Sequence, residues 1–189
     1  MRGPLYLAST SPRRGELLAK AAIPFHLHPP GPEPEGAGSP RDKAILRARA
    51  KALGAVPPSP EGPVLGADTV VALGELELGK PVDRAAAGEM LRQLEGRDHE
   101  VFTAQCLAEP ATGRFIEECA VARLRCAVLD PVRIEQYLDT GEWQGKAGGY
   151  AIQGHAADFL QLLAGDLDTV IGLSVVSVRR LLVQWSRGT

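Results

Sequence analysis

Apolar and polar positions along the chain follow two different periods, and each period predicts regular structure. The apolar run over residues 5–8 predicts a buried strand that leads into a hydroxyl-rich turn. Ser11 then stands where a helix N-cap belongs, and Pro12 stands at the first helical position. Leucines and alanines between residues 17 and 22 give this helix an apolar face. A short strand is expected next, over residues 23–27.

The middle of the chain combines longer patterns of both kinds. A helix is expected over residues 40–53, and a strand over 64–73 that turns at Gly74-Glu75 into a second strand over 76–80. Asp83 is expected to cap a helix that Gly96 ends. The remaining pattern predicts strands over 99–108 and 115–128, a helix after Asp130, an irregular segment over 141–154, a short helix over 159–163, a short strand over 169–171 and a helix over 174–185.

These elements mix without strict alternation of helix and strand. This order favours an α/β fold with a mixed, twisted sheet flanked by helices over a doubly wound parallel sheet. With 189 residues and no obvious linker, the chain is predicted to form a single domain over residues 1–189.

Composition narrows the classes of function. A net charge of −2 argues against a general nucleic-acid binder, because no basic surplus is present to neutralise phosphates. No apolar run approaches a membrane span, and the start of the chain lacks the apolar stretch of a signal peptide, so a cytoplasmic protein without a membrane partner is expected. Three cysteines without C-x-x-C spacing argue against a disulfide framework or a zinc site.

Residue usage also bears on the environment of the protein. The chain has no Asn, 16 Arg against 5 Lys, and 15 Pro. Loss of thermolabile amides and stiff loops are typical of thermophiles, although a GC-rich genome gives a similar bias toward Arg and Pro.

The first chemical signal is a pair of arginines at the start of the first helix. The helix dipole disfavours cations there by about 0.3–1 kcal/mol each when they are exposed. Arg13 and Arg14 stand beside Ser9, Ser11 and free backbone N–H groups, and this combination suits a phosphate. The alternative is two solvated arginines on a surface helix.

The second signal is Asp68, a single acid in an otherwise apolar strand. A carboxylate is costly to bury unless it is paired or binds a metal. A two-residue turn at Gly74-Glu75 would place Lys80 opposite Thr69, one step from Asp68. Such an Asp–Lys pair could activate water and stabilise charge, or it could be a structural ion pair at a strand end.

Further candidates lie on either side of this strand. Lys51, on the preceding helix, would by itself be a solvated charge. Glu33 or Glu35, in the Pro/Gly-rich loop before that helix, could reach a metal, since Mg²⁺ takes one or two carboxylates plus substrate phosphates. In the glycine-rich segment 145–154, Gln153 offers a donor and an acceptor that suit a base edge.

Taken in order along the chain, these residues form a set of motifs. The set comprises Ser9-Thr10-Ser11-Pro12-Arg13-Arg14 with Leu17-Leu18, Ala48 with Lys51-Ala52, Gly66-Ala67-Asp68-Thr69, Gly79-Lys80-Pro81, the spaced residues Leu94, Gly96, His99, Val101 and Thr103, and Gly145-Lys146-Ala147-Gly148-Gly149-Tyr150-Ala151-Ile152-Gln153-Gly154. The chain thereby resembles the Maf family (septum-formation inhibitor-like proteins) over nearly its whole length.

The resemblance implies a nucleoside triphosphate pyrophosphatase that cleaves between the α and β phosphates. It implies a divalent cation (Mg²⁺ or Mn²⁺), two lobes with a cleft between them as in inosine-triphosphatase-like folds, and a homodimer. The glycine-rich segment looks like that of the branch acting on dTTP and UTP rather than the branch acting on 7-methyl-GTP.

The resemblance also implies roles for particular residues. Asp68 looks like the proton acceptor, assisted by Lys51 and Lys80 and joined by Glu33 at the metal. The polyphosphate-binding positions match Ser9, Arg14, Lys51 and Lys80. The positions that set base preference match Arg13, Thr69 and Gln153.

Two segments depart from the family pattern. The acidic stretch over residues 30–35 is one residue shorter than usual, so Glu33 matches the metal-side acid better than Glu35. Residues 165–174 lack the Ser and Asn of the family's late motif.

Two rival functions stay open: a non-catalytic nucleotide-binding regulator of cell division, and a purine clean-up pyrophosphatase of the inosine-triphosphate type.

Overall fold

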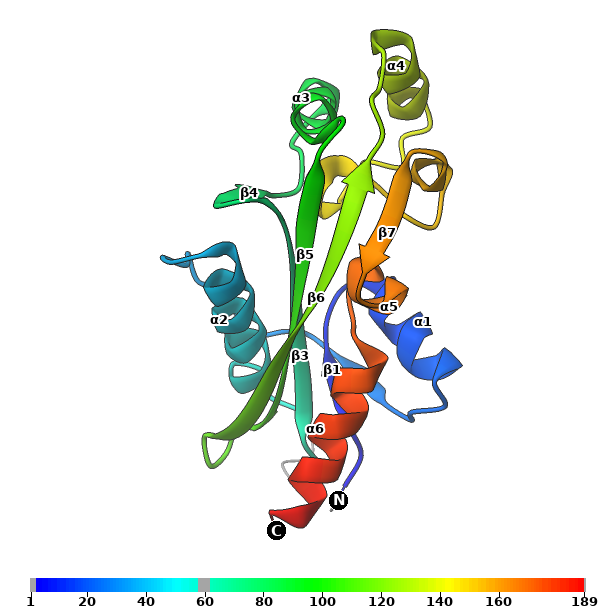
Figure 1. The fold of residues 1–189 in the computed structure, drawn as a ribbon. Helices are drawn as coiled ribbons and strands as arrows, with labels where there is room; N and C mark the ends of the chain where they lie inside the picture. Colours follow the sequence, from blue (N-terminus) through cyan, green and yellow to red (C-terminus); the bar gives the residue numbers. More distant parts are fainter. Residues whose placement is uncertain (1–2, 58–61, 189) are drawn as a thin grey trace.

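The computed structural model describes residues 3–57 and 62–188, in which seven strands form one sheet (Figure 1). The strands are β1 (Tyr6–Ala8), β2 (His26–His28), β3 (Val64–Leu73), β4 (Leu76–Leu78), β5 (Asp98–Glu109), β6 (Arg114–Cys126) and β7 (Leu160–Ala164). Their order is β2-β1-β3-β5-β6-β7, with β4 paired to β3. Because β1 runs parallel to β2 and β3 while the other pairs are antiparallel, the predicted mixed sheet is confirmed.

Helices cover both faces of this sheet. They are α1 (Pro12–Lys20), α2 (Pro40–Leu53), α3 (Arg84–Leu94), α4 (Pro131–Asp139), α5 (Leu167–Ile171) and α6 (Val175–Arg187), with 3₁₀ turns η1 (Ala147–Gly149) and η2 (His155–Asp158). Figure 1 shows α2 on one face, α1 and α6 on the other, and α3 and α4 at the far end of the long strands. Within the described ranges, no helix is long and apolar enough to cross a membrane.

Three hydrophobic cores follow from this arrangement. One lies between α2 and the sheet, and a second lies between the opposite face of the sheet and helices α1 and α6. The third surrounds α3 and α4 at the far end of β5 and β6. The molecule thus has two halves that share the long central strands. One half contains α1, α2 and α6 with the first two cores, and the other contains α3 and α4 with the third. The prediction of a single domain over residues 1–189 stays a prediction.

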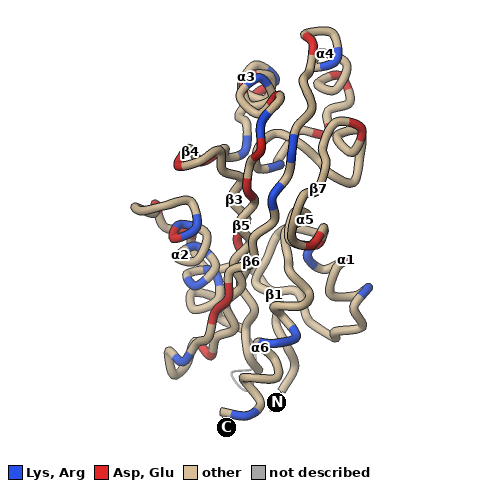
Figure 2. The backbone as a smooth tube through the Cα atoms, viewed as in Figure 1, with Lys and Arg blue, Asp and Glu red and all other residues tan. Residues whose placement is uncertain are grey.

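Helix α2 has the bounds that its sequence predicts. Pro40 is its first residue, and Ser39 and Asp42 form a reciprocal capping box before it. Its buried face is built of alanines, which let it lie close to β3. Its other side is basic, and Figure 2 shows this helix facing acidic positions on neighbouring strands. Arg47 pairs with Glu77 of β4, and Arg49 with Glu117 of β6, so ion pairs tie α2 to the sheet on two sides.

Three short segments differ from the prediction. Residues 159–163 were expected to be helical, but strand β7 (Leu160–Ala164) pairs there with the end of β6. Residues 169–171 were expected to be a strand, but they belong to α5, which begins after Asp166 and ends at Gly172 with φ +130°. The strand expected over 23–27 begins only at His26, because Ala22 takes a positive φ of 56° and Pro24 has no N–H for the sheet.

Candidate active site

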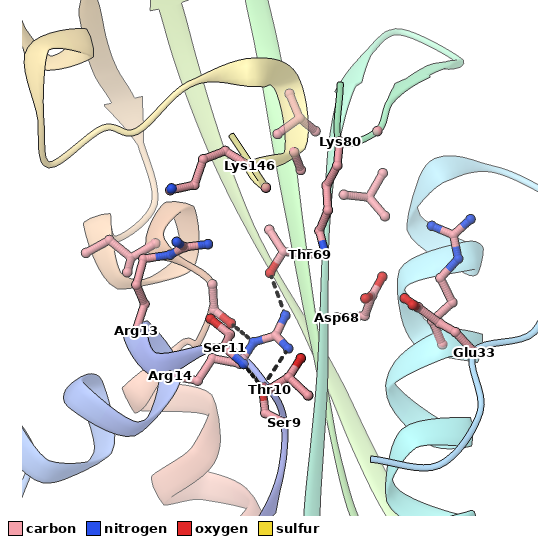
Figure 3. Close-up of a pocket in the computed structure, with 18 of the residues that line it drawn as sticks. Ser9, Thr10, Ser11, Arg13, Arg14, Glu33, Asp68, Thr69, Lys80 and Lys146 are labelled. Carbon is pink, nitrogen blue, oxygen red and sulfur yellow. Dashed lines mark hydrogen bonds between the residues drawn. The ribbon is translucent and has the colours of Figure 1, made fainter. Parts of the chain in front are cut away.

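A cavity of about 700 Å³ opens between the two halves of the molecule. Its walls come from the start of α1, the loop before α2, α2 itself, the middle of β3, the end of β4 and the glycine-rich segment (Figure 3). This volume lies within the range of sites for small molecules and cofactors. The residues predicted for the site all line this cavity, namely Ser9, Arg13, Arg14, Glu33, Lys51, Asp68, Thr69, Lys80 and Gln153.

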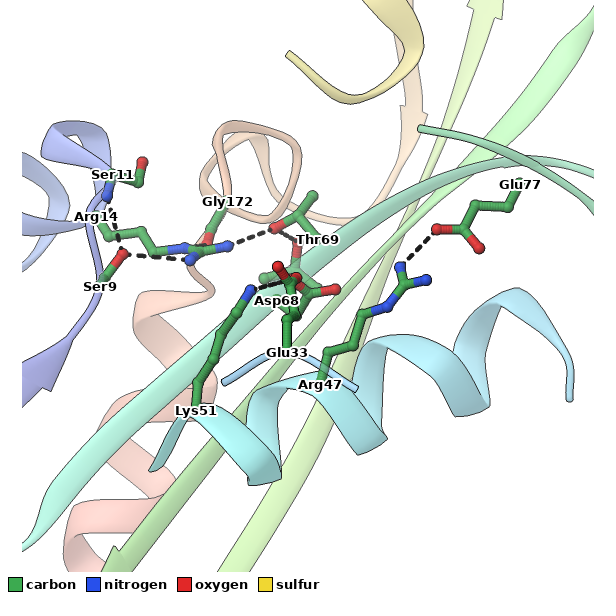
Figure 4. A network of polar contacts seen from close by, with 11 residues as sticks. Ser9, Ser11, Arg14, Glu33, Arg47, Lys51, Asp68, Thr69, Glu77 and Gly172 are labelled. Carbon is green, nitrogen blue, oxygen red and sulfur yellow. Dashed lines mark hydrogen bonds and ion pairs between the residues drawn. The ribbon is translucent and has the colours of Figure 1, made fainter. Parts of the chain in front are cut away.

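Arg14 is held at the base of the cavity by three acceptors from distant parts of the chain. Its Nε donates to the Gly172 carbonyl (2.9 Å), while its two terminal nitrogens donate to Ser9 Oγ (3.3 Å) and Thr69 Oγ1 (3.4 Å) (Figure 4). Burial lowers the pKa of Arg14, and the charge of Asp68 counteracts this effect. An arginine guanidinium stays charged in proteins, so the cavity floor carries a fixed cation with donors to spare.

The start of α1 adds unpaired donors beside this cation. Ser11 is the N-cap residue, as predicted, but in the described residues its side chain makes no capping hydrogen bond. Its backbone N–H instead donates to Ser9 Oγ at 3.1 Å. The first turn of α1 therefore leaves backbone N–H groups and the Ser11 hydroxyl available to an anion.

Lys51 and Asp68 form the most buried ion pair of the cavity. Lys51 Nζ donates to Asp68 Oδ1 at 2.5 Å and to Glu33 Oε1 at 2.7 Å (Figure 4). The Lys51 and Asp68 side chains are 11% and 8% exposed, whereas Glu33 is 52% exposed. The prediction that Lys80 is the partner of Asp68 is wrong, because the ion pair of Asp68 is with Lys51.

The hairpin brings Lys80 to the same cavity as Asp68, as predicted, but the strand pairing does not extend as far as Lys80. Val71 pairs with Leu78, as the two-residue turn predicts, but the ladder ends at Leu78, before Lys80. Past that point the chain turns toward the glycine-rich segment, where Gly148 donates its N–H to the Gly79 carbonyl. Lys80 points into the cavity from above (Figure 3), and its charge helps to lower the pKa of Glu33.

The two carboxylates differ in proton affinity. Burial raises the pKa of the Asp68 carboxyl, and the attraction of Lys51 and Arg14 offsets only part of this rise. Burial also acts to raise the pKa of Glu33, but the hydrogen bonds with Lys51 and Asp68 and the charges of Lys51 and Lys80 together outweigh it, so this pKa is lowered. Of the two, Asp68 is therefore the better proton acceptor, and Glu33 is the more firmly ionised.

The loop that carries Glu33 is docked against α2 by its backbone. Gly31 donates its N–H to the Lys51 carbonyl at 3.0 Å. A Cβ atom on Gly31 would stand 2.5 Å from the Ala50 carbonyl oxygen and 2.6 Å from the Gly54 Cα, so only glycine fits there. Lys51 thus holds this loop with its carbonyl and with its side chain.

The opposite wall carries the residues expected to read the base. Thr69 Oγ1 lies 3.0 Å from Thr103 Oγ1, which in turn donates to the Thr169 carbonyl at 2.7 Å. Arg13 is half-buried, and Gln153 is exposed at the rim. Burial and the charge of Arg13 lower the pKa of Lys146, which places these two cations on the same side of the cavity (Figure 3).

The segment that departs from the family pattern supports the cavity with two backbone carbonyls. Gly172 and Thr169 supply the carbonyls that hold Arg14 and Thr103. The Ser and Asn that residues 165–174 lack are therefore not needed for these two contacts.

Two charged residues of the cavity, Arg47 and Glu77, were not predicted from the sequence. Arg47 lies one turn before Lys51 on α2, and it bonds Glu77 of β4 at 2.5 Å. Glu77 also binds Lys43 at 3.2 Å. The i, i+4 spacing of Arg47 and Lys51 could have placed both on one face of the helix, but only the fold brings Glu77 to them.

Comparison with known proteins finds relatives that match nearly the whole chain. A protein named dTTP/UTP pyrophosphatase from Rhodospirillum rubrum is 43% identical over 183 residues, covering 95% of this chain and 87% of its own. Proteins of the same name from Hyphomonas neptunium (40% identical, 95% and 94% covered) and Pelotomaculum thermopropionicum (38% identical, 94% and 94% covered) match similarly. A family model described as Maf-like protein matches residues 4–185, and the chain therefore belongs to the Maf family.

Proposed function

We propose that the protein is a nucleoside triphosphate pyrophosphatase that hydrolyses dTTP and UTP to the monophosphate and pyrophosphate. The names of its relatives support the substrate pair and the reaction. The observation that carries the proposal within this chain is the buried Asp68, which faces Lys51 and Arg14 in a cavity of nucleotide size.

In this proposal Asp68 acts on water. It accepts a proton as the water oxygen attacks the α-phosphorus, the bond from that phosphorus to the α,β-bridging oxygen breaks, and pyrophosphate leaves. The raised pKa of Asp68 suits a proton acceptor, because a carboxylate that resists ionisation binds the proton more strongly.

The cations of the cavity offset charge on the phosphates. Arg14 is fixed by Ser9 and Thr69 and retains unused N–H donors, and Lys80 projects into the cavity with an exposed, flexible side chain. Lys51 would exchange a carboxylate for a phosphate oxygen. Fixed donors of this kind stabilise the charge that builds up in the transition state at little reorganisation cost.

The carboxylates of Glu33 and Asp68 fit a small divalent cation. They are hard oxygen donors that share one position, now held by the ammonium of Lys51. In the part of the chain that the structure describes, no three His, Cys, Asp or Glu side chains gather into a metal site, so the phosphates would complete the coordination. When bound, Mg²⁺ or Mn²⁺ would offset phosphate charge and polarise the P–O bonds.

Base selection is assigned to the wall with Arg13, Thr69 and Gln153. The Gln153 amide can both donate and accept, which matches the N3–H and carbonyl groups of thymine and uracil. Arg13 offers donors for a carbonyl.

We further propose that the protein is a homodimer in the cytoplasm. Sedimentation of the purified protein would test the dimer, and fractionation of the host cells would test the location.

Pyrophosphate release from a panel of nucleoside triphosphates with Mg²⁺, at raised temperature, tests the function. Turnover that favours dTTP and UTP is expected. Preferred turnover of inosine triphosphate or another purine would keep the reaction and overturn the assignment of the base. Tight nucleotide binding without turnover of any substrate would overturn the enzyme and favour a nucleotide-sensing regulator.

A further inference from the structure

The ammonium of Lys51 occupies the position between the two carboxylates of the cavity. Its Nζ lies 2.7 Å from Glu33 Oε1 and 2.5 Å from Asp68 Oδ1. Figure 4 shows Lys51 reaching from α2 to these two side chains. The carboxylates proposed to hold a divalent cation are therefore already bridged by a positive charge of the protein.

This bridge is a built feature of the fold. The Lys51 side chain is only 11% exposed, so it is not a surface lysine that happened to find a partner. Gly31 donates its N–H to the Lys51 carbonyl, and this hydrogen bond fixes the loop of Glu33 to Lys51. Lys51 itself is held in place by the capped helix α2.

We propose that the protein takes up its divalent cation together with the nucleotide, as one metal–triphosphate complex, because the Lys51 ammonium lies between the two carboxylates that would hold the cation. The inference rests on the proposed function and specifies its substrate. The nucleotide then has two tasks, since its phosphates supply ligands to the cation and a new partner to Lys51.

Electrostatics disfavours entry of the cation alone. A divalent ion between Glu33 and Asp68 would stand beside the displaced ammonium of Lys51, which would be left without a partner. Arg14 and Arg47 both feel the charges of these same carboxylates, so they add repulsion. The negative charge of a triphosphate reverses this balance.

Equilibrium dialysis with Mn²⁺ tests the inference without turnover. Retention of Mn²⁺ is measured on the full-length protein alone and with dTTP carrying a methylene group in place of the α,β-bridging oxygen, which cannot be cleaved there. We expect the analogue to raise the affinity of the protein for Mn²⁺ by roughly 5- to 150-fold, and Mn²⁺ to raise the affinity for the analogue by the same factor. Equal retention with and without the analogue would overturn the inference.

The variant Lys51→Met tests the role of the lysine. This substitution keeps the bulk of the side chain and removes its charge, so Mn²⁺ should now bind to the variant without nucleotide. Addition of Mn²⁺ alone should therefore raise the melting temperature of the variant. Lys20→Met, on the exposed end of α1, is the matched control and should behave as the wild type does. If Lys51→Met unfolds, Lys51→Gln offers an uncharged donor at the same place. A folded Lys51 variant that gains no affinity for Mn²⁺ alone contradicts the inference.

Failure of this inference can be told apart from failure of the proposed function. A wild-type protein that cleaves dTTP but binds Mn²⁺ equally well alone retains the function and loses the inference. A protein that retains Mn²⁺ only with the analogue, and that cleaves no nucleotide, retains the inference as a binding property and loses the function.

Discussion

Gly66 of β3 lies so close to α2 that a Cβ atom on it would stand 2.3 Å from the Ala48 carbonyl oxygen. The same atom would be 2.6 Å from the Ala52 amide nitrogen. Both contacts are with backbone, which cannot move aside as a flexible side chain can. This close approach of helix and strand is what allows Lys51 to reach Asp68 at 2.5 Å.

Gly66→Ala should therefore weaken both the fold and the ion pair. The added methyl group has to push α2 away from β3, and overpacking of this kind costs about 1–3 kcal/mol. Urea unfolding should show this loss, and pyrophosphate release should fall because Lys51 and Asp68 are drawn apart. Gly79→Ala, where nothing lies within 4 Å of the new Cβ, is the control for stability. Equal losses of unfolding free energy in both variants would contradict the argument.

Asp68→Asn tests the proton acceptor. The amide keeps the shape of the side chain but cannot accept the proton of water, so pyrophosphate release from dTTP should fall by roughly 10²- to 10⁴-fold. Nucleotide binding should persist, because Arg14 and Ser9 keep their mutual contact. Rapid-quench assays and titration with the uncleavable analogue separate the two effects. A variant that turns over at the wild-type rate would exclude Asp68 as the base.

Glu77→Gln tests the ion pairs between β4 and α2. Glu77 accepts from Arg47 and binds Lys43, and these half-buried contacts hold the hairpin from which Lys80 enters the cavity. Loss of the charge should lower the unfolding free energy by about 1 kcal/mol. It should also raise the KM for dTTP severalfold, because the hairpin that carries Lys80 is then no longer held against α2.

The neighbouring Glu75 provides the control for this variant. It is exposed at the hairpin turn, so Glu75→Gln should change the unfolding free energy by less than about 0.5 kcal/mol. If the KM for dTTP is the same in both variants, the hairpin does not position Lys80.

The long elements of the fold were predictable because each carries its own signal. The helix over residues 40–53 has Pro40 at its start and alanines at its buried positions, and the strand over 64–73 is nearly continuous in apolar residues. Residues 159–163 and 169–171 were predicted wrongly because five or fewer residues do not define a period. Pairing with the edge of β6 makes residues 160–164 a strand, and this long-range contact is not visible in the local sequence. Gly172 ends α5 directly after Ile171, but a single glycine does not by itself separate a short helix from a short strand.

The site was predictable as a set of residues but not as a set of contacts. The motifs placed the candidate residues at one cavity, and the structure brings them together there. The partner of Asp68 could not be inferred, because the hairpin offered Lys80 nearby in sequence while the contact with Lys51 depends on α2 crossing β3 at Gly66. Glu77 was missed for the same reason.

His99 lies on β5 and is buried against the glycine-rich segment. Its Nε2 lies 2.9 Å from the hydroxyl of Tyr150, and Tyr150 lines the cavity. Burial lowers the pKa of His99 to about 4, so the imidazole is neutral in the folded protein at neutral pH. In the unfolded chain the same group has an ordinary pKa of about 6.5.

The sign of the pH dependence follows from this difference. Between pH 6.5 and about 4 the unfolded state binds a proton that the folded state does not, so the free energy of unfolding falls as the pH falls through this window. The loss attributable to His99 is on the order of 3 kcal/mol. His99→Gln keeps a polar partner for Tyr150 and cannot titrate. Urea unfolding at a series of pH values should therefore show a shallower loss in this variant, and parallel curves for the two proteins would show that His99 is protonated as readily in the fold as outside it.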